Sequence, residues 1–112
     1  MPGSAQPQPI CQITVSNEAN FAAEIAVSGE NYGVELGKIE AEAKNVVFDL
    51  SKPVYVSTGS PFQVRVWISP YANDTTDTWV VYSEGSESEA VYVIGGSADK
   101  PTILFERFRP LN

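Results

Sequence analysis

The sequence predicts an all-β protein, an antiparallel β-sandwich of one domain, and three observations lead to this prediction. Apolar and polar residues alternate with a period of two along most of the chain, which is typical of strands that bury one face. Glycine, proline, asparagine and serine separate these segments at short intervals. The length of 112 residues fits a single domain with a modest core.

The clearest strand is predicted over Pro61–Pro70, between two prolines that cannot donate to a ladder. Its apolar face consists of Phe62, Val64, Val66 and Ile68, and its polar face of Gln63, Arg65, Trp67 and Ser69. A tryptophan on the polar face needs cover or a partner. Trp67 and Arg65 are therefore predicted to lie under a loop or the N-terminal segment, to form a homodimer interface, or to offer a stacking platform for a sugar.

The other elements follow in order. Before this strand, the pattern predicts strands at Ile10–Ser16 (Cys11, Ile13 and Val15 inward), Phe21–Ser28, Tyr32–Leu36 and Asn45–Leu50, an extended or irregular connection at Lys38–Lys44, and a short edge piece at Pro53–Val56. After it, strands are predicted at Thr78–Ser83, Ala90–Ile94 and Thr102–Phe108, with a solvated hairpin loop at Glu84–Glu89. This spacing is that of an immunoglobulin or fibronectin type III strand plus its turn.

Charge and composition exclude several classes of protein. The chain has 14 acidic and 7 basic residues, a net charge of −7, and no cluster of Lys and Arg for nucleic acid or an anionic membrane. No apolar run approaches the roughly 18–20 residues of a membrane span. Residues 1–9 read as a flexible tail before a domain at 10–112, and not as a signal peptide, so the protein is expected to be cytoplasmic or unconventionally secreted. Cys11, the only cysteine, reads as a small core residue.

The inventory of reactive groups predicts a non-enzyme without a cofactor. The chain has no histidine, so Ser-His-Asp and Cys-His arrangements are absent. The pairs Asp74/Asp77 and Glu87/Glu89 fall in predicted polar loops, where solvation is the simpler interpretation; a small carboxylate hydrolase is the remaining enzymatic alternative. Asn73, Asp74 and Asp77 offer oxygens to calcium but lack the spacing and glycine of an EF-hand, so no metal is assigned.

Aromatic placement gives the candidate ligand site. Two aromatic side chains flank the polar segment that follows the clearest strand, and rings beside amides and carboxylates suit sugar hydroxyls and ring faces. The predicted ligand-binding residues are Tyr71, Asn73, Asp74, Asp77 and Trp79.

Part of the chain resembles the fungal immunomodulatory proteins. The resemblance is carried by Ile25–Glu35 with its Ala-Val-Ser-Gly-Glu-Asn-Tyr-Gly-Val turn, by Val47-Phe48, by Phe62–Val66 leading to Ser69-Pro70, and by Asp77 before an apolar strand. It covers roughly residues 25–82. It implies an immunoglobulin or fibronectin type III-like sandwich, lectin-like binding of glycans, stimulation of immune cells and non-covalent dimers. The family's N-terminal helix and long first strand have no counterpart in Met1–Asn20, and 90–112 extends beyond the family's end.

These observations together predict a protein that binds and does not react, with cell-surface glycans or glycoproteins as its partners. The alternative is a structural or assembly subunit whose exposed aromatic side chains form an oligomer interface.

Overall fold

The computed structural model describes residues 7–51, 56 and 59–111, and these residues form strands, turns and bends without a helix. Ten strands follow one another along this part of the chain. They are β1 (Gln8–Ile10), β2 (Gln12–Asn17), β3 (Ala23–Gly29), β4 (Gly33–Ile39), β5 (Val46–Asp49), β6 (Pro61–Ser69), β7 (Ala72–Thr75), β8 (Val80–Tyr82), β9 (Ser88–Gly96) and β10 (Pro101–Pro110). The all-β prediction is therefore confirmed.

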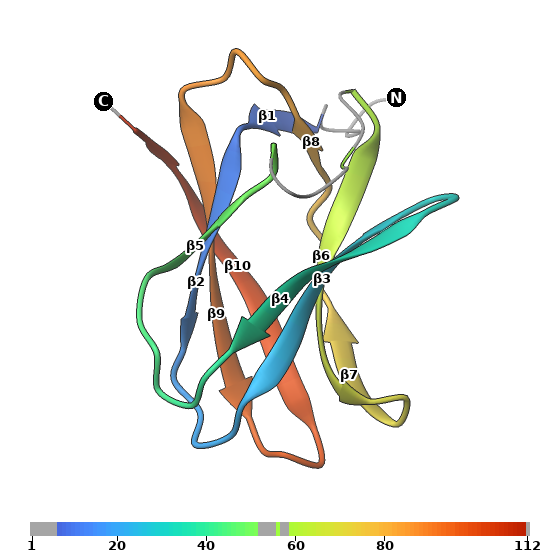
Figure 1. The fold of residues 1–112 in the computed structure, drawn as a ribbon, viewed down its shortest axis with the longest axis vertical. Coiled ribbons are helices and arrows are strands. Elements are labelled where there is room, and N and C mark those ends of the chain that lie inside the picture. The colour runs from blue at the N-terminus through green and yellow to red at the C-terminus, as the bar shows by residue number, and fades with distance from the viewer. Residues whose placement is uncertain (1–6, 52–55, 57–58, 112) are drawn as a thin grey trace.

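The strands form two sheets that pack against each other (Figure 1). The six-stranded sheet, sheet A, has the order β1-β8-β6-β3-β4, with β7 also paired to β6. The four-stranded sheet, sheet B, has the order β10-β9-β2-β5. Both sheets are mixed, because β1 runs parallel to β8 and β2 runs parallel to β9. The prediction of a purely antiparallel arrangement is wrong at these two pairs.

The parallel pairs arise because one N-terminal segment contributes to both sheets. A bend at Cys11 breaks the predicted strand Ile10–Ser16, so that β1 lies in sheet A and β2 in sheet B. The segment from β8 to β9 also crosses from sheet A to sheet B. It lies beside the N-terminal segment and runs in the same direction. Cys11 is only half-buried in this bend, so the prediction of a core cysteine is wrong. Gln8 and Pro9, which the sequence placed in the tail, pair with β8.

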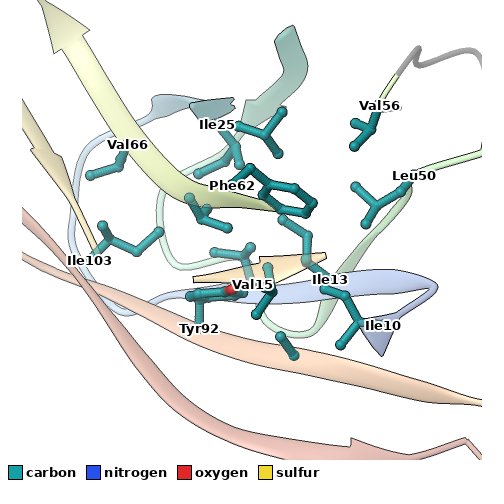
Figure 2. Packing of buried hydrophobic residues seen from close by; sticks show 14 of the residues in the cluster. Ile10, Ile13, Val15, Ile25, Leu50, Val56, Phe62, Val66, Tyr92 and Ile103 are labelled. Carbon is teal, nitrogen blue, oxygen red and sulfur yellow. The ribbon is translucent and has the colours of Figure 1, made fainter. Parts of the chain in front are cut away.

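The core lies between the sheets and takes alternate residues from their strands (Figure 2). The fully buried members from β6 and β9 are Phe62, Val64, Val66, Ala90, Tyr92 and Ile94. Each fully buried aliphatic or phenylalanine side chain stabilises the fold by about 1.5–3 kcal/mol relative to exposure. The period-two pattern therefore decides which face of each strand lies inside.

Three local predictions are corrected by the structure. Ile68 is exposed and not in the core, because the register of β6 shifts between Trp67 and Ser69 and this irregularity ends the alternation. Asn73–Asp77 is not all loop, because β7 reaches Thr75. The loop predicted at Glu84–Glu89 is shorter, because β9 begins at Ser88 and buries the next residue.

Other boundaries are less affected. β4 extends to Ile39, and the chain then continues through turns and irregular structure up to β5, as expected for most of Lys38–Lys44. Of the edge piece predicted at Pro53–Val56, only Val56 is described, and it is buried; the rest lies outside the described residues.

Candidate functional site

Two rows of side chains cross the outer face of sheet A, the face turned away from the core. Paired residues of neighbouring strands present their side chains on the same face, so the register defines each row. The first row, read from β4 through β3 and β6 to β7, is Glu35, Ala26, Arg65 and Thr75, and the second is Lys38, Glu24, Trp67 and Asn73. The candidate interface residues Arg65 and Trp67 thus lie beside the candidate ligand residue Asn73.

A shallow trough runs over β3 in this region. Its floor is made of small residues, and Ala26 on that floor is only 8% exposed although its side chain faces outward. The trough has a volume of about 280 Å³, with Glu35 on one side and Arg65 and Trp67 on the other. The two sides are two strand spacings apart, about 10 Å. This width admits a single extended chain or one sugar ring.

Arg65 orients the indole at the edge of the trough. The guanidinium carbon of Arg65 lies 5.9 Å from the centroid of the Trp67 ring, within the range of a cation–π contact. The salt bridges formed within the described residues involve Lys38, Lys44, Arg107 and Arg109, and Arg65 takes part in none of them. The N–H donors of this guanidinium can therefore bind a ligand in the trough.

Trp79 lies on the same outer face, at the other end of β6. Phe62 pairs with Val80 and Pro61 pairs with Val81, and Val80 is fully buried while Trp79, one residue earlier, is 40% exposed. The alternation therefore turns the indole outward. Trp79 lines a second hollow of about 400 Å³ together with Pro7, Glu30 and Pro61.

The five predicted ligand-binding residues do not form one site. Tyr71 is 95% exposed at the tip of the turn between β6 and β7. The Asp74 side chain accepts a hydrogen bond from the backbone N–H of Ile103 at 2.9 Å, and with Asp77 it lines a hollow against β10 that is separate from the trough. Asn73 and Trp79 belong to the outer face of sheet A, at opposite ends of it.

The oxygen groups considered for calcium diverge as well. The amide of Asn73 donates to the carbonyl of Pro70 at 2.9 Å, on the outer side, whereas Asp74 points toward β10. Within the ranges that the structure describes, no three His, Cys, Asp or Glu side chains gather in a way that could hold a metal ion.

Sequence reasoning missed a buried carboxylate in sheet B. Glu89 is only 3% exposed and accepts hydrogen bonds from Gln12 Nε2 at 2.8 Å and from Thr14 Oγ1 and Arg109 Nε, both at 2.5 Å. Burial raises the pKa of Glu89, but these three hydrogen bonds and the charge of Arg109 outweigh it and hold the pKa below its ordinary value. Because every partner comes from a strand of sheet B, this carboxylate ties β2, β9 and β10 together.

Only the strand register reveals this network. The pairs Gln12 with Glu89 and Arg109 with Glu89 join residues that are far apart in the sequence. In the sequence, the same glutamate ends a run of serines and glutamates, which is the signature of a solvated loop.

Comparison of the chain with models of known protein families, with curated proteins and with solved structures finds no significant match. In the part of the chain that the structure describes, no helix is long and apolar enough to span a bilayer.

Proposed function

We propose that this protein is a non-catalytic, lectin-like carbohydrate-binding protein, and that the trough beside Trp67 on the outer face of sheet A is its glycan site. The observation that carries the proposal is the combination of an indole, a guanidinium without an ion pair among the described residues, and a carboxylate around a floor of small side chains, with an amide next to the indole on the neighbouring strand β7. The residues in these roles are Trp67, Arg65, Glu35 and Asn73.

Each group has a chemical role toward a sugar. The C–H face of a pyranose packs on an indole, while hydroxyl groups both donate and accept hydrogen bonds. Glu35 accepts, Arg65 donates, and the amide of Asn73 can do both. The negative charges of Glu24 and Glu35 balance the positive charges of Arg65 and Lys38 on this face. This balance favours a neutral sugar over a polyanion.

Binding without catalysis is supported by the residues at hand. The chain has no histidine, and the trough is a shallow depression on a sheet face, not a deep cleft with carboxyl groups on opposite walls. In the pair Glu87/Glu89, the carboxylate of Glu89 already accepts hydrogen bonds from three side chains of sheet B.

We extend the proposal to the fold and the family. Two sheets enclosing one core support an immunoglobulin or fibronectin type III-like sandwich in which β1–β8 and β2–β9 are parallel. The segments that resemble the fungal immunomodulatory proteins include the β3–β4 hairpin and the start of β6, and β3 pairs with both β4 and β6. The resemblance itself implies cell-surface glycans as the ligand class and an immunomodulatory role.

Glycan array binding tests the proposal. We expect the wild type to bind at least one neutral glycan, and Trp67→Ala to weaken that binding by roughly thirtyfold, or about 2 kcal/mol, as for loss of a central aromatic anchor. Leu104→Ala is the matched control, because it removes an apolar side chain that is 66% exposed on the other sheet. A wild type that binds no glycan, or a Trp67→Ala variant with unchanged binding, would contradict the proposal.

The alternative is an assembly subunit that uses this face as an oligomer interface. It is favoured by β4, which is the edge strand of sheet A and borders the trough. Light scattering distinguishes the two functions: an oligomer that Trp67→Glu dissociates supports assembly, whereas a monomeric wild type excludes Trp67 as an oligomer contact.

A further inference from the structure

The two tryptophans of the chain share one face of one sheet. Trp67 and Gln63 are four residues apart on β6 and point to the same side, so they are separated by about 13 Å along the strand. Trp79 directly precedes β8, whose first residue Val80 pairs with Phe62, so Trp79 lies near the start of β6, one strand across, which adds about 5 Å in the perpendicular direction. The two indoles therefore mark the ends of one surface.

The two hollows on this face follow each other along the strands. Ser28 belongs to the trough and is paired with Gln63. Two residues further toward the β3–β4 turn and the start of β6, Glu30 and Pro61 line the hollow at Trp79. In Figure 1 the β3–β4 hairpin projects away from the two sheets next to β6.

We propose that the ligand is an extended neutral oligosaccharide that runs along β6 from Trp67 to Trp79, with Arg65 and Gln63 binding the hydroxyl groups of the units between the two indoles. This inference rests on the proposed glycan-binding function and names its substrate class. One sugar ring cannot reach both tryptophans at this separation, whereas a chain of several units can.

A glycan fits this surface better than a protein partner does. The centre of a protein interface is a contiguous cluster of apolar and aromatic side chains from which charged groups are depleted. Here the polar side chains of Gln63 and Arg65 separate the two indoles. Alternation of aromatic faces with hydrogen-bonding groups matches a ligand that itself alternates apolar ring faces with hydroxyl groups.

The surface is fixed before the ligand arrives. β6 is paired on both sides, and its inward residues lie in the core. Thr76 bridges the gap between β7 and β8 along this strand: its N–H donates to the carbonyl of Val64 at 2.9 Å, and its hydroxyl accepts from the N–H of Val64 at 3.2 Å. Thr76 also donates through its hydroxyl to the carbonyl of Thr78 at 3.4 Å. These bonds anchor the approach to Trp79, so little ordering is needed on binding.

Isothermal titration calorimetry of the full chain tests the inference. The probes are neutral glucose, mannose and N-acetylglucosamine oligomers, each as monosaccharide, disaccharide and hexasaccharide. In a series that binds, we expect the hexasaccharide to bind at least about tenfold more tightly than the disaccharide. Trp79→Ala should remove this gain and leave the disaccharide affinity unchanged, because the disaccharide occupies the trough at Trp67.

Two controls keep the result interpretable. Trp79→Phe retains an aromatic face and should keep most of the gain even if Trp79→Ala perturbs the fold, and Leu104→Ala should bind as the wild type does. If disaccharide and hexasaccharide bind equally, or if Trp79→Ala leaves the hexasaccharide affinity unchanged, the extended ligand is excluded while glycan binding at Trp67 stands. If no oligomer binds and the glycan array is also negative, both proposals are overturned.

Discussion

Glu89 shows how one side chain gains its properties from its neighbours. Its carboxylate is buried among Thr14, Gln12 and Arg109, and all three donate hydrogen bonds to it. Hydrogen bonds to an ionised group are stronger than neutral ones, so the ionised form is favoured in the folded protein. The carboxylate therefore links the stability of sheet B to pH.

The pKa of Glu89 is lower in the folded state than its ordinary value of 4.5. Its contribution to stability is complete above the unfolded-state pKa and is lost as pH falls through the folded-state pKa. We expect the free energy of unfolding, measured by urea denaturation, to fall below about pH 4.5, and Glu89→Gln to weaken that dependence. Glu84→Gln, at an exposed loop position, is the control. Identical pH profiles for wild type and Glu89→Gln would contradict this linkage.

Tyr92 is the opposite case, because its polar hydroxyl is buried among the described residues without a hydrogen bond to offset the loss of water. Its hydroxyl has no hydrogen-bond partner in the described structure, and burial raises the pKa of the phenol strongly. A buried donor without a partner costs about 1–3 kcal/mol. We expect Tyr92→Phe to raise the thermal midpoint, or to leave it unchanged, because the ring contact with Phe105 at a centroid distance of 5.7 Å is kept. A midpoint lower by several degrees would show that the hydroxyl is satisfied.

At the scale of elements, the β3–β4 hairpin depends on a close contact between a glycine and a ring. A Cβ atom on Gly29 would lie 2.0 Å from Cε1 of Tyr32. The ring cannot withdraw freely, because the hydroxyl of Tyr32 donates to the carbonyl of Ser60 at 3.2 Å. The hairpin carries Ser28, Gly33 and Glu35 of the trough, so this contact also positions the candidate site.

Gly29→Ala should therefore destabilise the protein by about 1–3 kcal/mol, as overpacking does. The cost should be smaller in a Tyr32→Ala background, where the space is free, and the two substitutions should show this coupling in a double-mutant cycle measured by urea unfolding. Gly85→Ala is the control, because nothing lies within 4 Å of its Cβ position. Additive effects of the two substitutions would show that the ring does not limit position 29.

Strand existence could be predicted and strand extent only in part. β6 was predictable from the alternation of Phe62, Val64 and Val66, but its irregularity was not, because nothing in Trp67-Ile68-Ser69 marks a register shift. The bend at Cys11 was missed for a similar reason. The residues on both sides continue one apolar pattern, and the switch from sheet A to sheet B is imposed by the neighbouring strands.

At the scale of the whole molecule, the two sheets have different outer faces. Sheet A carries the trough and both tryptophans, whereas sheet B carries the Glu89 network with Arg107 and Arg109 of β10. The candidate site could be predicted in its chemistry, since exposed aromatic and polar residues were identified. Which residues make up the site was not predictable, because Tyr71, Asp74 and Asp77 do not lie on the face of sheet A that carries Arg65 and Trp67.

The sequence by itself determined that the chain is all-β, has one core and contains no histidine chemistry. Side-chain alternation depends on adjacent residues alone, so it can be read locally. Only the tertiary structure decided which strands are neighbours, that two pairs are parallel, that Glu89 is buried, and that Trp67 and Trp79 share one face. Each of these depends on pairing between residues far apart in the chain, which the local pattern does not encode.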